Sequence, residues 1–533
     1  MTFSGFVRGG LRLAAAGGVA AGLMFSAPAS AETTLKAVMH APLRVLDPIL
    51  TTAAITVAHS YMIYDQLFGL DAELKPRPQM VDTWTVSDDE LTYRFVLRDG
   101  LAFSDGRPVT AEDVVASINR WRQRDSMAQV LNKSLKSVDV IDDKTFAVVL
   151  TEPFGWLLYA FGKVGSNLLV IMPKEVAATP ATEAVKDFTG SGPFVFKADE
   201  FKPGVKTVYT KNPHYKPRTD EGVWNTGRKE AMLDRVEWLV LPDMMTAVNA
   251  LINGEIDYLE SLPADLAPLL EGEKNVTVAI NNPMGWQGHL RMNTLHPPFD
   301  NPKIRRAVLM GLNQEDFMRA QVGDPKLYRV CYALFTCGTW LKTEAGSEGL
   351  LRGDVEGAKK LLKEAGYDGT KVVLLHPTDF AEATAYGPIT AQTLRAIGFN
   401  VDMQVMDWSA VQTRRAKMDP PDQGGWNIFH SNWSAFTVSN PISNQPLNGA
   451  GKKAWLGWPE DAKIEEMRAA FAKESDPEKQ KALAVEIQKR GYEIASYAEL
   501  GEYGPRIAYR SAVKNVPVGS GTWFWNMTLD KKR

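Results

Sequence analysis

The stretch LTYRFVLRDGLAFSDGRPVTAEDV, residues 91–114, carries the clearest structural pattern in the chain. Apolar side chains at 91, 93, 95 and 97 alternate with residues 92, 94, 96 and 98, the period of two expected of a strand with one buried face. Asp-Gly pairs at 99–100 and 105–106 are turn signals. Thr110 can cap a following helix, in which apolar residues recur at helical spacing as far as Trp121. The stretch therefore predicts a strand, two turns and a helix.

A second pair of strands completes the unit around this stretch. Residues 138–141 and 145–150 are apolar-rich segments on either side of an Asp-Asp turn at 142–143. We therefore predict a self-contained α+β unit over about residues 69–200.

The remainder of the chain alternates strand and helix patterns. Before the unit we predict a strand at 35–38 and a helix at 55–67. After it we predict a hairpin at 193–196 and 205–209, a strand at 236–241, a helix from Asp243 to Gly254 and a strand at 256–259. Strands at 372–375 and 401–406 flank a helix at 382–397, which is a β-α-β unit and favours a parallel sheet. Long amphipathic helices are predicted at 462–473 and 477–492.

The first 31 residues have the pattern of a cleavable signal peptide. Arg8 and Arg12 precede an apolar stretch from Leu13 to Phe25, and Ala29-Ser30-Ala31 provides small residues for cleavage. The apolar stretch is shorter than the roughly 20 residues of a membrane-spanning helix. We expect cleavage after Ala31 and export to the periplasm.

Composition excludes two classes of partner. A formal net charge of −3 over 533 residues is unlike the concentrated basic charge of a nucleic-acid-binding protein. After the leader, no apolar run is long enough for a membrane span, so we expect no stable membrane insertion.

Cys331 and Cys337 are the two cysteines of the sequence. An exported chain enters an oxidising compartment, which favours a disulfide between them. A zinc site is the alternative, but one cysteine pair with no nearby histidine lacks the ligands that zinc prefers. We therefore predict a disulfide and no metal site.

Five stretches in order resemble the extracellular solute-binding protein family 5, the dipeptide, oligopeptide and nickel-chelate binding proteins of ABC importers. The first is the stretch 91–114. The others are Gly190-Ser-Gly-Pro-Phe194, Asn212-Pro-His-Tyr215, Gly254-Glu-Ile-Asp257 and Asn301-Pro-Lys-Ile-Arg-Arg-Ala307. Together they extend from residue 91 to residue 307.

The resemblance implies an α/β fold of the two-lobed periplasmic binding protein type (type II, Venus-flytrap). Lobe one would comprise residues 32–68, an extra subdomain at 69–200, residues 201–285 and a return at 500–533. Lobe two would comprise residues 286–499. A small solute would bind between the lobes, which close over it and present it to the importer's permease subunits. No catalytic residue and no cofactor are implied, and we expect a monomer.

The segment from Gly425 to Pro441 resembles the family stretch that delivers a tryptophan and then an aspartate to the cleft. In peptide-binding members that aspartate pairs with the α-ammonium of the ligand. Here Trp433 matches the tryptophan, Phe436 stands near the expected aspartate, and Asn440 precedes Pro441 in place of Asp. A free peptide amine would find no charged partner in this loop, which argues against simple dipeptides.

Further ligand contacts are expected from residues near the same cleft. Trp433 and Phe436 can stack on a ring or hold a cation against their faces, although both are also typical core residues. Each remaining candidate has a structural alternative, as a core or solvated side chain. These candidates are Asn432 and His430 on the same segment, Trp286, Gln287 and Arg291 at the hinge, Arg415 as a partner for a carboxylate, and Tyr61 on the first helix.

Two other functions remain open on the sequence. An exported hydrolase would need an assembled catalytic signature, and neither His-Glu-x-x-His nor Gly-x-Ser-x-Gly occurs. A binding protein that serves mainly a chemoreceptor would capture its solute in the same way.

Overall fold

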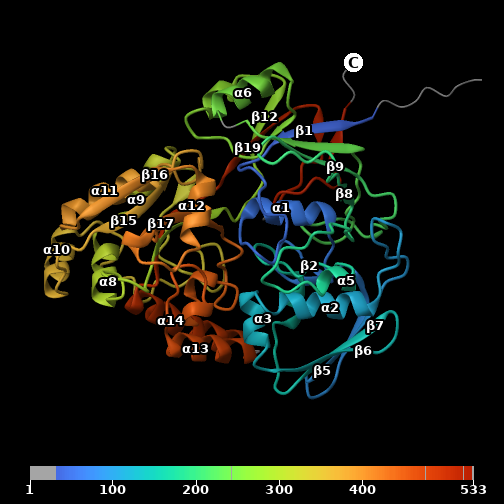
Figure 1. Ribbon diagram of the computed structural model, residues 1–533, viewed down its shortest axis with the longest axis horizontal. Helices are drawn as coiled ribbons and strands as arrows, with labels where there is room; N and C mark the ends of the chain where they lie inside the picture. The colour runs from blue at the N-terminus through green and yellow to red at the C-terminus, as the bar shows by residue number, and fades with distance from the viewer. Residues whose placement is uncertain (1–31, 242, 475, 520, 531–533) are drawn as a thin grey trace, which may run out of the picture. The chain divides into compact units, whose positions relative to one another are not determined.

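Three sheets of four or more strands organise the computed structural model, which describes residues 32–530 except 242, 475 and 520 (Figure 1). The predicted signal peptide, residues 1–31, lies outside the described residues. Residues from Thr33 onward form one compact unit.

The first sheet has the strand order β12-β19-β11-β1-β10-β9-β8. Its strands are β1 (Thr34–Val38), β8 (Phe194–Phe196), β9 (Lys206–Lys211), β10 (Arg235–Leu239), β11 (Tyr258–Leu259), β12 (Val276–Ile280) and β19 (Arg506–Arg510). β1 lies parallel to both β10 and β11, and β19 pairs antiparallel with β11 and β12. The last part of the chain therefore returns to the sheet in which it began.

The second sheet has the strand order β14-β18-β13-β17-β15-β16. Its strands are β13 (Trp286–Met292), β14 (Tyr328–Arg329), β15 (Val372–Pro377), β16 (Val401–Met406), β17 (Ile428–Ser434) and β18 (Tyr497–Tyr503). β15 and β16 are parallel, and α11 (Tyr386–Ile397) connects them and packs against both. The predicted β-α-β unit is confirmed.

The helix of this unit begins at Tyr386, four residues after the predicted start, and residues 381–385 form turns instead. Pro388 explains the difference. It lacks an N–H and is tolerated in the first turn of a helix, but it would disrupt the interior of a helix that began at 382. Glu382 is consequently a turn residue.

The third sheet, with the order β4-β5-β7-β6, forms the core of the predicted α+β unit. Its strands are β4 (Val81–Val86), β5 (Thr92–Leu97), β6 (Leu135–Val140) and β7 (Thr145–Leu150). Along β5 the side chains of Tyr93, Phe95 and Leu97 are buried while those of Thr92 and Arg94 are exposed, as the alternation predicted. α2 (Ala111–Trp121) packs against β6 and β7 of this sheet, and at its start the Asp113 carboxylate accepts hydrogen bonds from the backbone N–H and hydroxyl of Thr110.

A buried ion pair joins this unit to the loop that follows β1. Arg120 on α2 donates to both carboxylate oxygens of Asp47, at 3.1 and 2.8 Å, and both side chains are almost completely buried. Charge-assisted bidentate contacts of this kind define geometry as well as energy. The orientation of α2 is thereby tied to the first sheet.

The remaining elements are short strands and the helices around the sheets. Two further strand pairs are β2 (Phe68–Leu70) with β3 (Pro76–Pro78), and β20 (Val513–Lys514) with β21 (Thr528–Leu529). The helices in the first half are α1 (Ala54–Ile63), α3 (Ser126–Leu131), α4 (Leu157–Gly162), α5 (Lys174–Ala177), α6 (Met244–Asn253) and α7 (Ala267–Glu271). Those in the second half are α8 (Pro302–Gly311), α9 (Gln314–Gln321), α10 (Val355–Glu364), α12 (Trp408–Arg415), α13 (Ala462–Lys473) and α14 (Pro477–Ile494), with 3-10 turns at Pro421–Gln423, Gln445–Leu447 and Gly451–Lys453. None of the helices in the described residues is long and apolar enough to cross a membrane.

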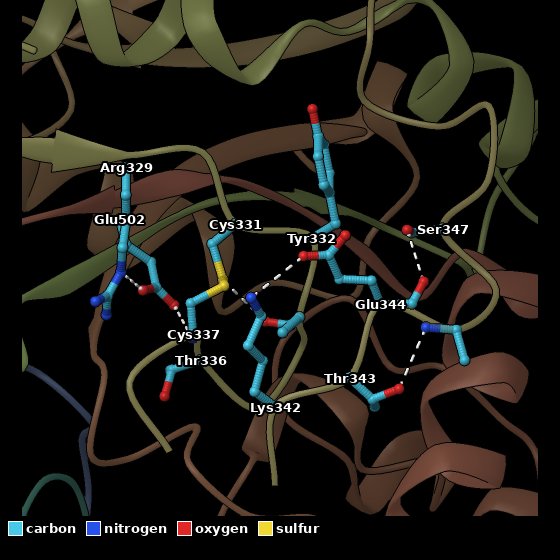
Figure 2. Close-up of polar contacts among 12 residues, drawn as sticks. Arg329, Cys331, Tyr332, Thr336, Cys337, Lys342, Thr343, Glu344, Ser347 and Glu502 are labelled. Atoms are coloured by element: carbon cyan, nitrogen blue, oxygen red, sulfur yellow. Dashed lines mark hydrogen bonds and ion pairs between the residues drawn. A yellow bond between two sulfur atoms is a disulfide. The ribbon is translucent and has the colours of Figure 1, made fainter. Parts of the chain in front are cut away.

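The disulfide between Cys331 and Cys337 is formed, as predicted (Figure 2). Glu502 on β18 secures the loop that it closes, because its carboxylate accepts the backbone N–H of Cys337 at 3.0 Å and pairs with Arg329 at 2.5 Å. The two sulfur atoms and a Glu502 oxygen lie within 4.8 Å of one another, but disulfide bonding removes the thiolates that would bind a metal ion.

Replacing both cysteines by serine should lower the free energy of unfolding by about 2 kcal/mol, the loop-entropy value for so short a loop. Urea unfolding with and without reductant measures the change. The reductant should destabilise the wild type to the level of the double variant and leave that variant unchanged. A wild type that is insensitive to reductant would contradict the expectation.

Candidate functional site

A pocket lies between the ends of the first sheet and the second. From the side of the first sheet, the lining includes His40, Tyr61 and Glu260, together with Asn281, Asn282, Gly519, Gly521 and Thr522. From the side of the second sheet, it includes Trp286, Phe380, Glu382, Trp408, Arg415, Trp433 and Trp455. The lining is rich in aromatic rings with a few ionisable groups among them, which is the composition of a binding site for a small molecule. We refer to it as the cleft pocket.

On the side of the first sheet, His40 and Glu260 form an ion pair. Nδ1 of His40 lies 2.7 Å from Oε2 of Glu260, and the same oxygen accepts the His40 backbone N–H at 2.9 Å. Burial opposes protonation of the imidazole, but the Glu260 charge and hydrogen bond outweigh it and raise the pKa of His40 to about 9. The pair is therefore an imidazolium against a carboxylate at neutral pH.

On the side of the second sheet, the turn before α11 brings Glu382 to the pocket. Its backbone carbonyl accepts a hydrogen bond from the Asn432 side chain at 2.7 Å, which ties the turn to β17. Burial raises the pKa of the Glu382 carboxyl, partly offset by the charge of His40 and a hydrogen bond from Ser261. Its Oε2 is shielded from solvent and has no hydrogen-bond partner among the described residues.

Arg415, the last residue of α12, is a buried cation held by aromatic rings. Its side chain is 5% exposed, and its guanidinium carbon lies 5.0 Å from the ring centroid of Trp408 and 5.2 Å from that of Phe429. Its Nε has no hydrogen-bond partner in the described part of the chain. Burial lowers the pKa of Arg415 to about 10. Phe380 stacks on Trp408 with centroids 4.2 Å apart, which holds this aromatic platform in place.

Five of the ligand-contact residues predicted from the sequence line the cleft pocket. Trp433 and Asn432 reach it from β17, Trp286 from β13, Arg415 from α12 and Tyr61 from α1. Trp433 packs edge-to-face on Trp455 at 5.0 Å, and its Nε1 finds no acceptor among the described residues. A buried indole N–H of this kind is available to a bound molecule.

The other predicted ligand-contact residues do not line the pocket, because their side chains are engaged by other groups of the protein. Gln287 donates to the Ala333 carbonyl and its side-chain oxygen contacts His289 at 2.8 Å. Arg291 is fully buried and donates to four backbone carbonyls, those of Leu456, Pro446, Ser496 and Trp455. Its guanidinium orders the chain that surrounds it.

His430 and Phe436 have protein partners as well. Nε2 of His430 lies 2.8 Å from the Thr390 hydroxyl on α11, and burial lowers the pKa of His430 to about 3, so it is neutral. Phe436 packs edge-to-face on Trp224 with centroids 4.7 Å apart. Trp224 comes from the part of the chain that builds the first sheet.

Sequence reasoning missed His40, Glu260 and Glu382. His40 follows β1 and Glu260 follows β11, and these strands are parallel neighbours. Side chains after the carboxyl ends of adjacent parallel strands meet in one crevice, the usual ligand position of such sheets. Pairing the predicted strands 35–38 and 256–259 would therefore have found the first two residues, whereas the misplaced start of α11 concealed Glu382.

The family model for "Bacterial extracellular solute-binding proteins, family 5 Middle" matches residues 75–455. The chain belongs to this family. The resemblance noted in the sequence is confirmed, and so is the two-lobed α/β fold. The protein is a solute-binding protein of the kind that delivers its ligand to an ABC importer.

Individual relatives agree with this assignment. The chain is 39% identical to a probable peptide ABC transporter periplasmic-binding protein, y4tO, of Sinorhizobium fredii strain NGR234, over 96% of this chain and 97% of that protein. It is 26% identical to the glutathione-binding protein GsiB of Salmonella typhi, over 86% and 87% of the two chains. Among solved structures, the binding protein AgaA from A. tumefaciens R10, in complex with agropinic acid, has a TM-score of 0.77 at 20% identity, over 94% and 99% of the two chains.

The His40–Glu260 pair should make the stability of this solute-binding protein depend on pH. Because the pKa of His40 is about 9 when folded and near 6.5 when unfolded, its contribution is complete below pH 6.5 and disappears as the pH rises through 9. Relative to a His40→Gln variant, the wild type should lose up to about 3 kcal/mol of unfolding free energy across that interval. Urea unfolding of both proteins at pH 6, 7.5 and 9 measures this, and parallel pH profiles would contradict it.

Proposed function

We propose that this protein captures a small, peptide-like organic solute with at least one carboxylate in the cleft pocket, and hands it to the permease subunits of an ABC importer in the periplasm. The observation that carries the proposal is Arg415, a buried guanidinium at the pocket with an unpartnered Nε. A buried cation is costly unless an anion pairs with it, and a guanidinium matches a carboxylate best. The names of the two relatives, a peptide transporter component and a glutathione-binding protein, agree with this class of ligand.

We propose lobe boundaries that follow the sheets. Lobe one comprises residues 32–285, with the extra subdomain at 69–200 and the C-terminal return, and lobe two is built on the second sheet from residue 286. Membership of β18 in the second sheet favours a return to lobe one near Gly504, a few residues later than the predicted residue 500. Ligand that contacts both lobes favours the closed arrangement, since only differential affinity shifts such an equilibrium.

Transport requires no chemical step, and we propose none. The protein would act as a monomer without a cofactor, after export and removal of residues 1–31. Phe436, packed on Trp224, provides no carboxylate from the β17 loop, so the amine of a simple dipeptide would find no charged partner at that position.

A thermal-shift screen tests the function directly. Peptides, glutathione, opines, betaines, oligosaccharides and metal chelates are added separately, and one narrow class bearing carboxylates should raise the melting temperature, because a ligand that binds only the folded state stabilises it by mass action. Loss of uptake of that solute in a deletion strain would separate transport from chemoreception. If no solute binds and a chromogenic ester or glycoside is hydrolysed instead, the proposal fails.

Arg415→Gln should weaken binding of the carboxylate-bearing solute found in that screen by about 10- to 100-fold, the equivalent of losing one charge-assisted hydrogen-bonded pair. Isothermal titration calorimetry measures the affinity. Arg319→Gln, on the exposed surface of α9, is the matched control and should bind like the wild type. Equal affinities for the Arg415 and Arg319 variants would remove Arg415 from the site.

A further inference from the structure

The Glu382 carboxylate lacks a full counter-charge. Its Oε2 is shielded from solvent, and no described residue donates a hydrogen bond to it. The turn that carries it is held by Asn432, whose side chain donates to the Glu382 carbonyl and whose Oδ1 accepts the Tyr386 hydroxyl at 3.2 Å. The carboxylate is therefore positioned by β17 and α11 at the edge of the cleft pocket.

The nearest cation is already committed to another acid. His40 lies 2.7 Å from Glu260, and the two side chains are 13% and 10% exposed. Glu382 interacts with the His40 charge at longer range, while the Glu260 charge opposes its ionisation. Two carboxylates therefore share one imidazolium where the first and second lobes meet. A carboxylate oxygen that is shielded from solvent and has no partner is unfavourable, and one added positive charge would balance the group.

The surroundings suit a protonated amine. Trp286, Trp433 and Tyr61 line the same pocket, and their ring faces attract a cation. Arg415, the other cation of the lining named above, stacks on Trp408 and Phe429, and no ion pair joins it to Glu382 among the described residues. An unpartnered carboxylate oxygen also requires an N–H donor, which an ammonium group has and a quaternary nitrogen does not.

We propose that Glu382 binds a protonated primary or secondary amine of the solute, in a subsite completed across the cleft by Ser261 and the His40–Glu260 pair. The solute then carries an ammonium group at Glu382 and a carboxylate at Arg415. This inference rests on the proposed function and narrows its ligand to amino-carboxylates with N–H on the cationic nitrogen. The ammonium partner is a turn residue before α11, not the β17 loop position occupied by Phe436.

Calorimetric titration at pH 7 with two probes tests the subsite. Tri-L-alanine and glutathione are each used with a free amino group and as the N-acetyl derivative. The wild type should bind at least one free-amine probe, and its N-acetyl derivative at least tenfold more weakly. Glu382→Gln should bind the free-amine probe at least tenfold more weakly than the wild type, with less than a threefold change for the acetylated one. Glu364→Gln, at the exposed end of α10, is the control and should bind both as the wild type does.

The outcomes separate the subsite from the proposed function. If the wild type binds free and acetylated probes equally, or Glu382→Gln retains the affinity of the wild type, the ammonium subsite is overturned while solute capture stands. The same holds if the wild type binds neither probe but binds a solute without an amine in the thermal-shift panel. If nothing in either set binds, the proposed function fails and the subsite with it. The comparison of free and acetylated probes uses the wild type alone, so it does not depend on how the variant folds.

Discussion

Two antiparallel chain segments run side by side from the second sheet to the first, and the rest of the structure depends on that pairing. In the second sheet Trp286 on β13 faces Tyr503 on β18, and in the first sheet Ile280 on β12 faces Arg506 on β19. Gly285 lies between them at φ +77°, and a Cβ there would be only 2.5 Å from the Tyr503 carbonyl oxygen. Trp286 also lines the cleft pocket, so a change in how these two segments pass between the sheets would move this lining residue.

The electrostatics of the pocket follow from this architecture. The side of the first sheet supplies His40 and Glu260, which follow adjacent parallel strands and are already paired. The side of the second sheet supplies Glu382 and Arg415 from a turn and a helix end, each with an atom that lacks a partner in the described residues. Buried polar groups in proteins are almost always satisfied, so an unpartnered atom at a pocket calls for an explanation. In the proposed function, a solute that completes these two groups and also contacts the residues from the side of the first sheet would favour the arrangement in which the two sides close on it.

Local patterns predicted much of the fold but only part of the site. The alternation of Tyr93, Phe95 and Leu97 depends on backbone geometry alone, so it is readable without tertiary information. Arg291 is different, because nothing near it in sequence indicates that carbonyls from 446, 455, 456 and 496 converge on its guanidinium. Glu382 was concealed by its neighbours, since a helical pattern continues upstream of Tyr386 although the helix begins there. Sites assembled from strand ends and turns require the pairing of strands to be known first.

Phe436 stands near the position where the family resemblance leads us to expect an aspartate, and its contacts show what the aromatic side chain does there. A carboxylate at this position would have to pair with a cation or remain exposed, but the phenyl ring instead packs on Trp224 from the opposite lobe at 4.7 Å. Such an edge-to-face contact contributes about 1 kcal/mol beyond the area it buries, and here it forms between the lobes. Further contacts join the same two parts of the chain, among them Trp156 stacked on Phe471 at 5.5 Å and Lys473 paired with Glu152 at 2.7 Å. The aromatic side chain at position 436 therefore places an apolar contact between these two parts of the chain. In the proposed subsite the acidic group is Glu382, in the turn that precedes α11.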